Sequence, residues 1–89
     1  MKTVEGFKLR TLGDDRILVA EGLKQIDFGK MISLNETACW LYQQIEGKEF
    51  AVSDVISLLK NEYGIDDDLA QRDAASFCES LLKAGAFIE

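Results

Sequence analysis

The chain of 89 residues contains no histidine and no proline, and it has only two cysteines. Without histidine, it lacks the commonest metal ligand and the commonest general base. Cys39 and Cys78 lie far apart, and there is no C-x-x-C pair of the kind that binds zinc or carries out redox chemistry. We therefore expect no metal site and no cofactor. Both cysteines are expected to be small buried apolar side chains.

Long apolar runs and excess positive charge are also missing. No run approaches the roughly 18 residues that span a bilayer, so we expect no membrane association. The first ten residues, MKTVEGFKLR, lack the apolar centre of a secretory signal, which favours a cytoplasmic protein. The net charge of −6 repels phosphate backbones and argues against a nucleic-acid partner. The length predicts that residues 1–89 form a single domain with one core.

The first third of the chain has the pattern of a sheet. Residues 7–12 (FKLRTL) alternate apolar and polar side chains, which predicts a half-buried strand. Residues 16–21 (RILVAE) follow a Gly-Asp-Asp turn and are rich in strand formers, which predicts a hairpin. Residues 25–33 predict a third strand, interrupted by a bulge or kink at Gly29. Short turns between the three strands predict an antiparallel meander.

The stretch 31–45, MISLNETACWLYQQI, joins the sheet to the helices without a linker. It begins as a strand-like piece, and its apolar residues then recur at helical spacing, which predicts a first helix at 34–46. Ser33 and Glu36 have the S-x-x-E spacing of a capping box, while Asn35 is an alternative N-cap. The sequence does not choose between the two caps.

Two further helices are predicted, and a glycine follows each of them. Residues 53–63 have helical spacing, with Ser53 as the expected N-cap and Gly64 after the last turn. Residues 67–84 predict the third helix, whose aspartate-rich start suits the positive end of the helix dipole. Residues 86–88 are either a cover over the core or a last strand. The fold is therefore expected to be α+β, a three-stranded antiparallel sheet followed by three helices, as in a small winged helix-turn-helix domain.

The third helix is apolar on two faces. One face is a normal core stripe, formed by Ala70, Ala74, Phe77, Leu81 and Ala84. The second face carries the small or apolar residues Ala75, Cys78 and Leu82. Two interpretations stay open for this second face. Either another helix of the domain covers it, or it is a groove for a partner.

A winged helix-turn-helix domain commonly binds DNA, but the charges of the third helix argue against that use. Residues 66–73 (DDDLAQRD) and the neighbouring Glu62 contain five acids and one arginine, whereas a helix that reads a duplex needs Arg or Lys. DNA binding or transcription regulation is kept as the alternative function. We do not expect an enzyme, because the serines have no histidine to activate them.

Three stretches in a specific order point to a known family. They are LNETA at 34–38, LLKNEYGID at 58–66 and RDAASFCESLLKAGAFIE at 72–89. Together they resemble the PqqD family, the peptide-recognition proteins of ribosomally made, post-translationally modified peptide pathways (RiPP recognition elements). In one departure, the family often has tryptophan where this chain has Tyr42, and Trp40 stands two residues earlier.

The resemblance implies a winged helix-turn-helix domain that binds no nucleic acid. Family members take up the leader segment of a precursor peptide as an added strand on the edge of the third strand, packed against the last helix. They present this peptide to a modifying enzyme, often a radical SAM protein. The physics of a meander agrees, because its edge strands expose unpaired backbone groups. The oligomeric state is left open, although the 7–12 edge would allow dimerisation.

The resemblance and the two-faced helix together give a set of expected peptide-binding residues. Six lie on the third strand and four on the last helix. They are Ile26, Asp27, Phe28, Lys30, Met31, Ile32, Ala75, Cys78, Glu79 and Leu82.

Overall fold

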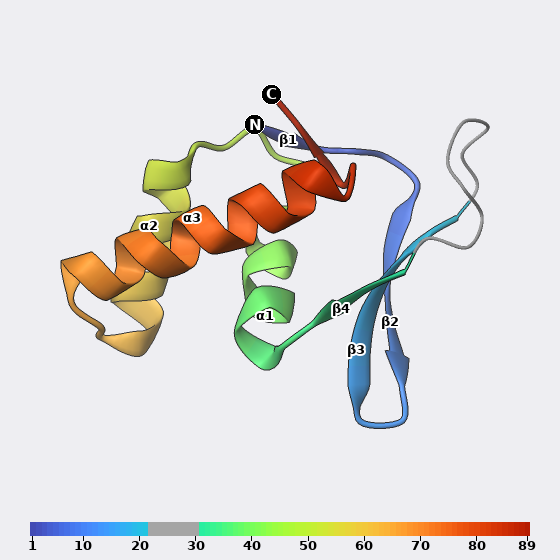
Figure 1. Ribbon diagram of the computed structural model, residues 1–89, viewed down its shortest axis with the longest axis horizontal. Coiled ribbons are helices and arrows are strands. Elements are labelled where there is room, and N and C mark those ends of the chain that lie inside the picture. The colour runs from blue at the N-terminus through green and yellow to red at the C-terminus, as the bar shows by residue number, and fades with distance from the viewer. Residues whose placement is uncertain (22–30) are drawn as a thin grey trace.

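A computed structural model describes residues 1–21 and 31–89 (Figure 1). The strands are β1 (Lys2–Thr3), β2 (Phe7–Leu12), β3 (Asp15–Ala20), β4 (Met31–Leu34) and β5 (Phe87–Ile88). The helices are α1 (Glu36–Ile45), α2 (Val52–Tyr63) and α3 (Asp67–Lys83). The predicted α+β class is confirmed, with a three-stranded antiparallel sheet in the order β2-β3-β4 that precedes three helices.

The hairpin of β2 and β3 pairs Phe7 with Ala20 and Leu12 with Asp15. Its turn contains Gly13 at φ +66°, a left-handed conformation that glycine adopts without strain. The second strand runs one residue earlier than predicted, over 15–20 instead of 16–21, because Asp15 already pairs across the turn. Leu18, on the central strand, is fully buried beneath the helices.

The third strand of the sheet is β4, which pairs with β3 and places Ile32 opposite Leu18. It continues one residue beyond the predicted end at 33 and passes directly into α1. The predicted start at 25 and the predicted kink at Gly29 lie outside the described residues. Figure 1 shows the sheet on one side of the molecule and the three helices on the other, with α3 lying across α1 and α2.

Asn35 is the N-cap of α1. Its Oδ1 atom accepts a hydrogen bond from the backbone N–H of Ala38 at 2.8 Å, which decides between the two caps that the sequence left open. The helix runs over 36–45, slightly shorter than the predicted 34–46, because Leu34 still belongs to β4.

The predicted Ser53 cap of α2 is wrong. The helix begins at Val52, with Ala51 in the N-cap position. The carboxylate of Asp54 reaches back and accepts a hydrogen bond from the Ala51 N–H at 2.8 Å. An acidic side chain at the third helical position can accept a hydrogen bond from the free backbone N–H at the N-cap, so the helix can start without a hydroxyl side chain as its cap.

The aspartate-rich start of α3 forms as predicted. Asp66 is the N-cap, and its Oδ1 atom accepts a hydrogen bond from the Leu69 N–H at 2.8 Å. Asp67 and Asp68 occupy the first turn, where negative charge complements the helix dipole. The helix ends at Lys83, one residue before the predicted end.

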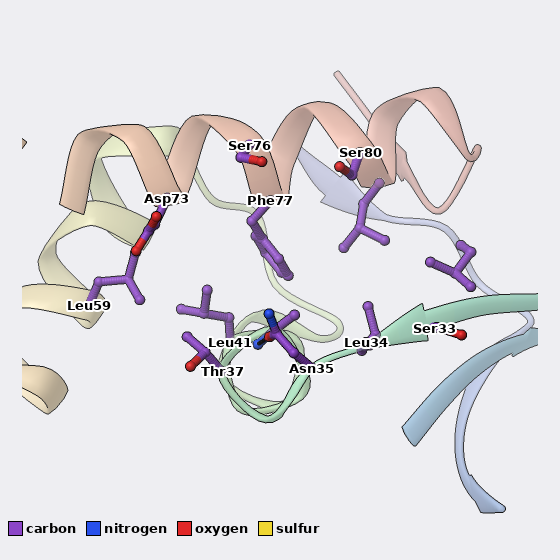
Figure 2. Close-up of a pocket in the computed structure, with 13 residues that line it drawn as sticks. Ser33, Leu34, Asn35, Thr37, Leu41, Leu59, Asp73, Ser76, Phe77 and Ser80 are labelled. Carbon is purple, nitrogen blue, oxygen red and sulfur yellow. Dashed lines mark hydrogen bonds between the residues drawn. The ribbon is translucent and has the colours of Figure 1, made fainter. Parts of the chain in front are cut away.

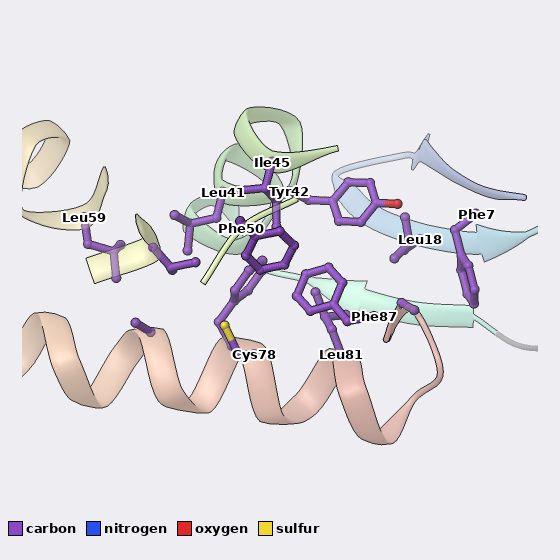
Figure 3. Close-up of a cluster of buried hydrophobic side chains, with 14 of the residues drawn as sticks. Phe7, Leu18, Leu41, Tyr42, Ile45, Phe50, Leu59, Cys78, Leu81 and Phe87 are labelled. Carbon is purple, nitrogen blue, oxygen red and sulfur yellow. The ribbon is translucent and has the colours of Figure 1, made fainter. Parts of the chain in front are cut away.

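Residues 86–88 fulfil both of the alternatives considered for them. Phe87 and Ile88 form β5, which pairs with β1, and the side chain of Phe87 is also part of the core (Figure 3). The Phe87 ring meets Phe50 and Phe77 edge-on, with ring centroids 4.9 and 5.6 Å apart. Strand β1 was not expected, because two residues are too few to show a periodicity.

Both cysteines are buried, as expected. Cys78 is only 2% exposed and belongs to the core, and burial raises the pKa of its thiol. A raised pKa keeps the thiol protonated and unreactive at neutral pH. Within residues 1–21 and 31–89, no helix has the length and apolar character needed to cross a membrane.

Candidate functional site

A groove of about 340 Å³ lies between β4, the first turns of α1 and one flank of α3 (Figure 2). The side chains along it come from four consecutive elements of the chain. They are Ile32, Ser33, Leu34, Asn35, Thr37, Ala38, Leu41, Leu59, Asp73, Ser76, Phe77, Ser80 and Leu81. The strand-to-helix junction without a linker therefore builds one wall, and α3 builds the other.

The floor of the groove is apolar. Leu41 from α1 and Leu81 from α3 are buried, and the Phe77 ring points from α3 toward the opposite wall (Figure 2). Ser76 and Ser80 are exposed along the α3 side of the rim. Such a surface offers apolar contact area at its centre and hydrogen-bonding groups at its margins, which is the usual composition of a binding site.

The groove runs beside an open sheet edge. In the part of the chain that the structure describes, β4 pairs with β3 on one side and has no strand on its other side. Every second residue of such an edge directs its backbone N–H and C=O away from the sheet. Met31 is 62% exposed, while Ile32 and Leu34 pack against the core. Over its described residues, the structure thus has an unpaired strand edge directly beside a groove.

Two of the six residues predicted on the third strand lie on this edge. Met31 opens β4, and Ile32 is one of the residues that line the groove. Ile26, Asp27 and Phe28 lie outside the described residues. The same is true of Lys30, which directly precedes β4.

The four residues predicted on α3 do not line the groove. Ala75 is exposed, and Cys78 is buried in the core. Glu79 is exposed and its Oε1 lies 2.9 Å from the Lys83 Nζ. Leu82 is half-buried and packs against the core. The predicted face of the helix is therefore separate from the groove, and its contact with a peptide stays a prediction.

The separation of the two flanks follows from helix geometry. Successive helical residues are about 100° apart, so Leu82 lies about 160° round the helix from Ser80, almost on the opposite side. The core stripe, which contains Phe77 and Leu81, lies between these two flanks. Sequence reasoning chose the flank with small apolar residues, whereas the groove lies on the flank with Ser76 and Ser80. The signal for this flank was a row of small polar residues at helical spacing beside Phe77.

The groove holds no group suited to acid–base chemistry at neutral pH among its buried residues. The nearest buried phenol, Tyr42, faces the sheet side of the core, and burial together with the charge of Glu46 raises its pKa to about 12. No three His, Cys, Asp or Glu side chains within the described ranges are placed to hold a metal ion. The apolar floor and the hydroxyl groups of the rim give the groove the composition of a binding surface.

The family model of Coenzyme PQQ synthesis protein D (PqqD) matches residues 12–86. The chain belongs to the PqqD family. The match spans all three helices and the whole β4 edge, and it confirms the resemblance found in the sequence. No curated protein sequence matches this PqqD-family chain.

Two solved structures are similar to this PqqD-family chain. One is TbiB1 in complex with the TbiA(beta) leader peptide, with a TM-score of 0.72, 17% identity and coverage of 100% of both chains. The other is lasso peptide synthetase B1 complexed with the leader peptide, with a TM-score of 0.72 and 22% identity. This second match covers 99% of the present chain and 96% of the other. At these identities the likeness shows a shared fold.

Proposed function

We propose that this domain binds the leader segment of a ribosomally made precursor peptide and presents it to a modifying enzyme. It acts as an adaptor that performs no catalysis itself. We expect it to work in the cytoplasm, where ribosomes make such precursors. The partner enzyme is expected to be a tailoring enzyme of the same pathway, such as a radical SAM protein.

The observation that carries this proposal is the open edge of β4 directly beside the groove. An extended peptide that joins the edge gains main-chain hydrogen bonds, which supply affinity without regard to sequence. Its alternate side chains then point into the groove, where the apolar floor around Leu41 and Phe77 supplies specificity. β4 has four residues and so offers about 13 Å of edge, enough for a short strand.

Family membership and the names of the similar structures support the same function. Both TbiB1 and lasso peptide synthetase B1 are described as complexes with leader peptides. On β4, Met31 and Ile32 are the proposed contacts. Ile26, Asp27, Phe28 and Lys30 stay predicted contacts that lie outside the described residues. On α3, we now place the contacts on the groove residues Ser76 and Ser80 and their neighbours.

The alternative, DNA binding by α3, has little support from its charges. Along the helix stand four acidic residues and two basic ones, Arg72 and Lys83, and Lys83 forms an ion pair with Glu79. The acids near the N-terminus of the helix would meet the phosphates of a duplex and repel them. An acidic recognition helix therefore disfavours this use.

The test is a titration of the protein with fluorescent leader peptides, encoded by short reading frames beside its gene. We expect a Kd of roughly micromolar, or about −8 kcal/mol, because a disordered leader loses conformational freedom on binding. Backbone amide NMR shifts should concentrate on β4 and on the Ser76–Ser80 flank of α3. Absence of binding by every such leader, or retardation of a labelled DNA duplex at low salt, would contradict the proposal.

A further inference from the structure

Asp73 is the one formally charged residue among the described residues that line the groove. Its side chain is exposed at the end of the groove near Leu59 (Figure 2). Two nearby acids, Asp66 and Asp67, have partners among the described residues. Asp67 pairs with Lys60 at 3.2 Å and accepts a hydrogen bond from Gln71, and Asp66 caps the helix. Within residues 1–21 and 31–89, Asp73 has no ion-pair or hydrogen-bond partner.

The surroundings of Asp73 add to its negative potential. Residues 35–89, which form all three helices, carry eleven acids and four bases, whereas residues 1–34 carry five acids and six bases. Two of the four bases in the helical part, Lys60 and Lys83, are already paired. A positive side chain of a bound peptide would therefore be attracted to this end of the groove.

The distance between Asp73 and Phe77 matches the repeat of an extended chain. Four residues of α3 advance about 6 Å along the helix axis. In a strand, side chains two residues apart lie on the same face and are about 6.6 Å apart. A peptide strand on β4 whose side chains face α3 would therefore place one side chain against Phe77 and the next side chain on that face against Asp73. This match holds for either direction of the peptide.

We propose that Asp73 is a specificity-determining residue that selects peptides with Lys or Arg two positions away from an apolar residue seated at Phe77. This inference rests on the proposed function, because it requires a peptide strand in the groove. It adds a particular chemistry to that strand, namely one cation at a fixed spacing from an apolar anchor. Arginine and lysine both satisfy it, since the carboxylate is exposed and accessible from solvent.

The experiment uses a displayed library of random peptides about twelve residues long, which covers the four-residue edge and both flanks. The library is selected against the wild-type protein, against Asp73→Asn and against Asp68→Asn. Asp68→Asn is the matched control, because it removes an equal charge from an exposed position of α3 that does not line the groove. Thermal melts of the three proteins establish that all are folded.

Selection against wild type and against Asp68→Asn should enrich peptides with Lys or Arg two positions from an apolar residue. Selection against Asp73→Asn should not enrich them. For one enriched peptide, Asp73→Asn should weaken binding about three- to fivefold at low salt, the size expected for an ion pair near the surface. Asp73→Lys should bind that peptide still more weakly, and replacing its cation by Glu should restore binding to Asp73→Lys.

Three kinds of failure are distinguishable. The role of Asp73 would be overturned if the selected peptides bound at the β4 edge but showed no enrichment of Lys or Arg. It would also be overturned if selection against Asp73→Asn enriched Lys or Arg as strongly as selection against wild type. Peptide binding itself would stand in both cases. Peptides that bind equally well when the β4 edge is blocked by proline would overturn strand addition at this edge and this inference with it. Absence of binding by every leader peptide would instead overturn the proposed function.

Discussion

The rings of Tyr42 and Phe87 stack almost parallel, with their planes inclined by 4° and their centroids 6.3 Å apart. Tyr42 comes from α1, the helix that follows the open strand edge, and Phe87 comes from β5 at the end of the chain. This contact holds the last strand against the helices. Phe87 also contacts Phe77, whose ring lines the groove. The packing of Phe87 in the core therefore also supports the wall of the groove.

Phe87→Ala should lower the free energy of unfolding by about 3–5 kcal/mol, because it leaves a cavity among the rings of Tyr42, Phe50 and Phe77. Urea denaturation followed by circular dichroism measures the change. Ile88→Ala is the matched control, since Ile88 is the neighbouring strand residue but is 54% exposed, and its change should stay within about 0.5–1 kcal/mol. Equal effects of the two substitutions would show that Phe87 does not anchor the core.

Stability should fall when the pH rises through the titration of Tyr42. Its pKa is raised from 10.0 to about 12 in the folded state, so the folded protein keeps the phenol proton that the unfolded chain loses first. The contribution is fully present below pH 10 and is lost between about pH 10 and 12, amounting to roughly 2–3 kcal/mol. Urea denaturation at closely spaced pH values measures it.

Tyr42→Phe is the control for this pH dependence, because it keeps the ring stack and removes the titrating hydroxyl. The variant should lose less stability than wild type over the same pH interval. A wild-type curve identical to that of Tyr42→Phe would show that the phenol titrates normally in the folded protein.

Filling the groove should weaken peptide binding without unfolding the domain. Ser80→Trp places a large side chain on the groove flank of α3, and we expect peptide affinity to drop at least about tenfold by steric exclusion. Because Ser80 is exposed, the melting temperature should change little. Fluorescence anisotropy with a library-derived peptide measures the affinity.

Ala75→Trp is the matched control for the groove. Ala75 is also exposed on α3 but lies on the opposite flank, which was the face predicted from the sequence. This variant should bind peptide as wild type does. Should Ala75→Trp lose binding while Ser80→Trp keeps it, the flank with Ala75, Glu79 and Leu82 would be the site after all.

Local sequence patterns were sufficient to predict most of the strands and helices. Period-two alternation in 7–12 and helical spacing in 53–63 depend only on near neighbours, and the elements they predict form within one or two residues of the expected bounds. β1 could not be predicted, because its two residues become a strand only by pairing with β5 at the far end of the chain. The prediction of Ser53 as N-cap was wrong because the helix already begins at Val52, where the Asp54 carboxylate accepts a hydrogen bond from the Ala51 N–H.

The site was less accessible to sequence reasoning than the fold. Periodicity locates the centre of the core stripe on α3 but does not reveal which flank another element covers. Ser76 and Ser80 look like ordinary solvent-exposed residues until β4 is placed beside them. The partner strand was predictable, because a meander must end in an open edge, and Met31 and Ile32 lie on that edge.

The β4 edge itself can be tested by placing proline at Met31, Ile32 and Ser33 in turn. In an antiparallel sheet, the N–H and C=O of one residue point to the same side, and successive residues alternate. Met31 and Ser33 should therefore behave alike, and Ile32 should behave in the opposite way. Proline removes one N–H wherever it stands, so the variants report on the direction of that group.

At positions whose N–H points away from β3, the fold should survive and peptide binding should weaken by about 2–3 kcal/mol, for a lost hydrogen bond plus the clash of the ring. At positions whose N–H points toward β3, the domain itself should be destabilised. Met31→Ala and Ser33→Ala serve as controls that change the side chain and keep the backbone donor. Urea denaturation and peptide titration of each variant separate the two effects. If all folded proline variants bound peptide as tightly as wild type, the peptide would not join β4, and α3 alone would have to recognise it.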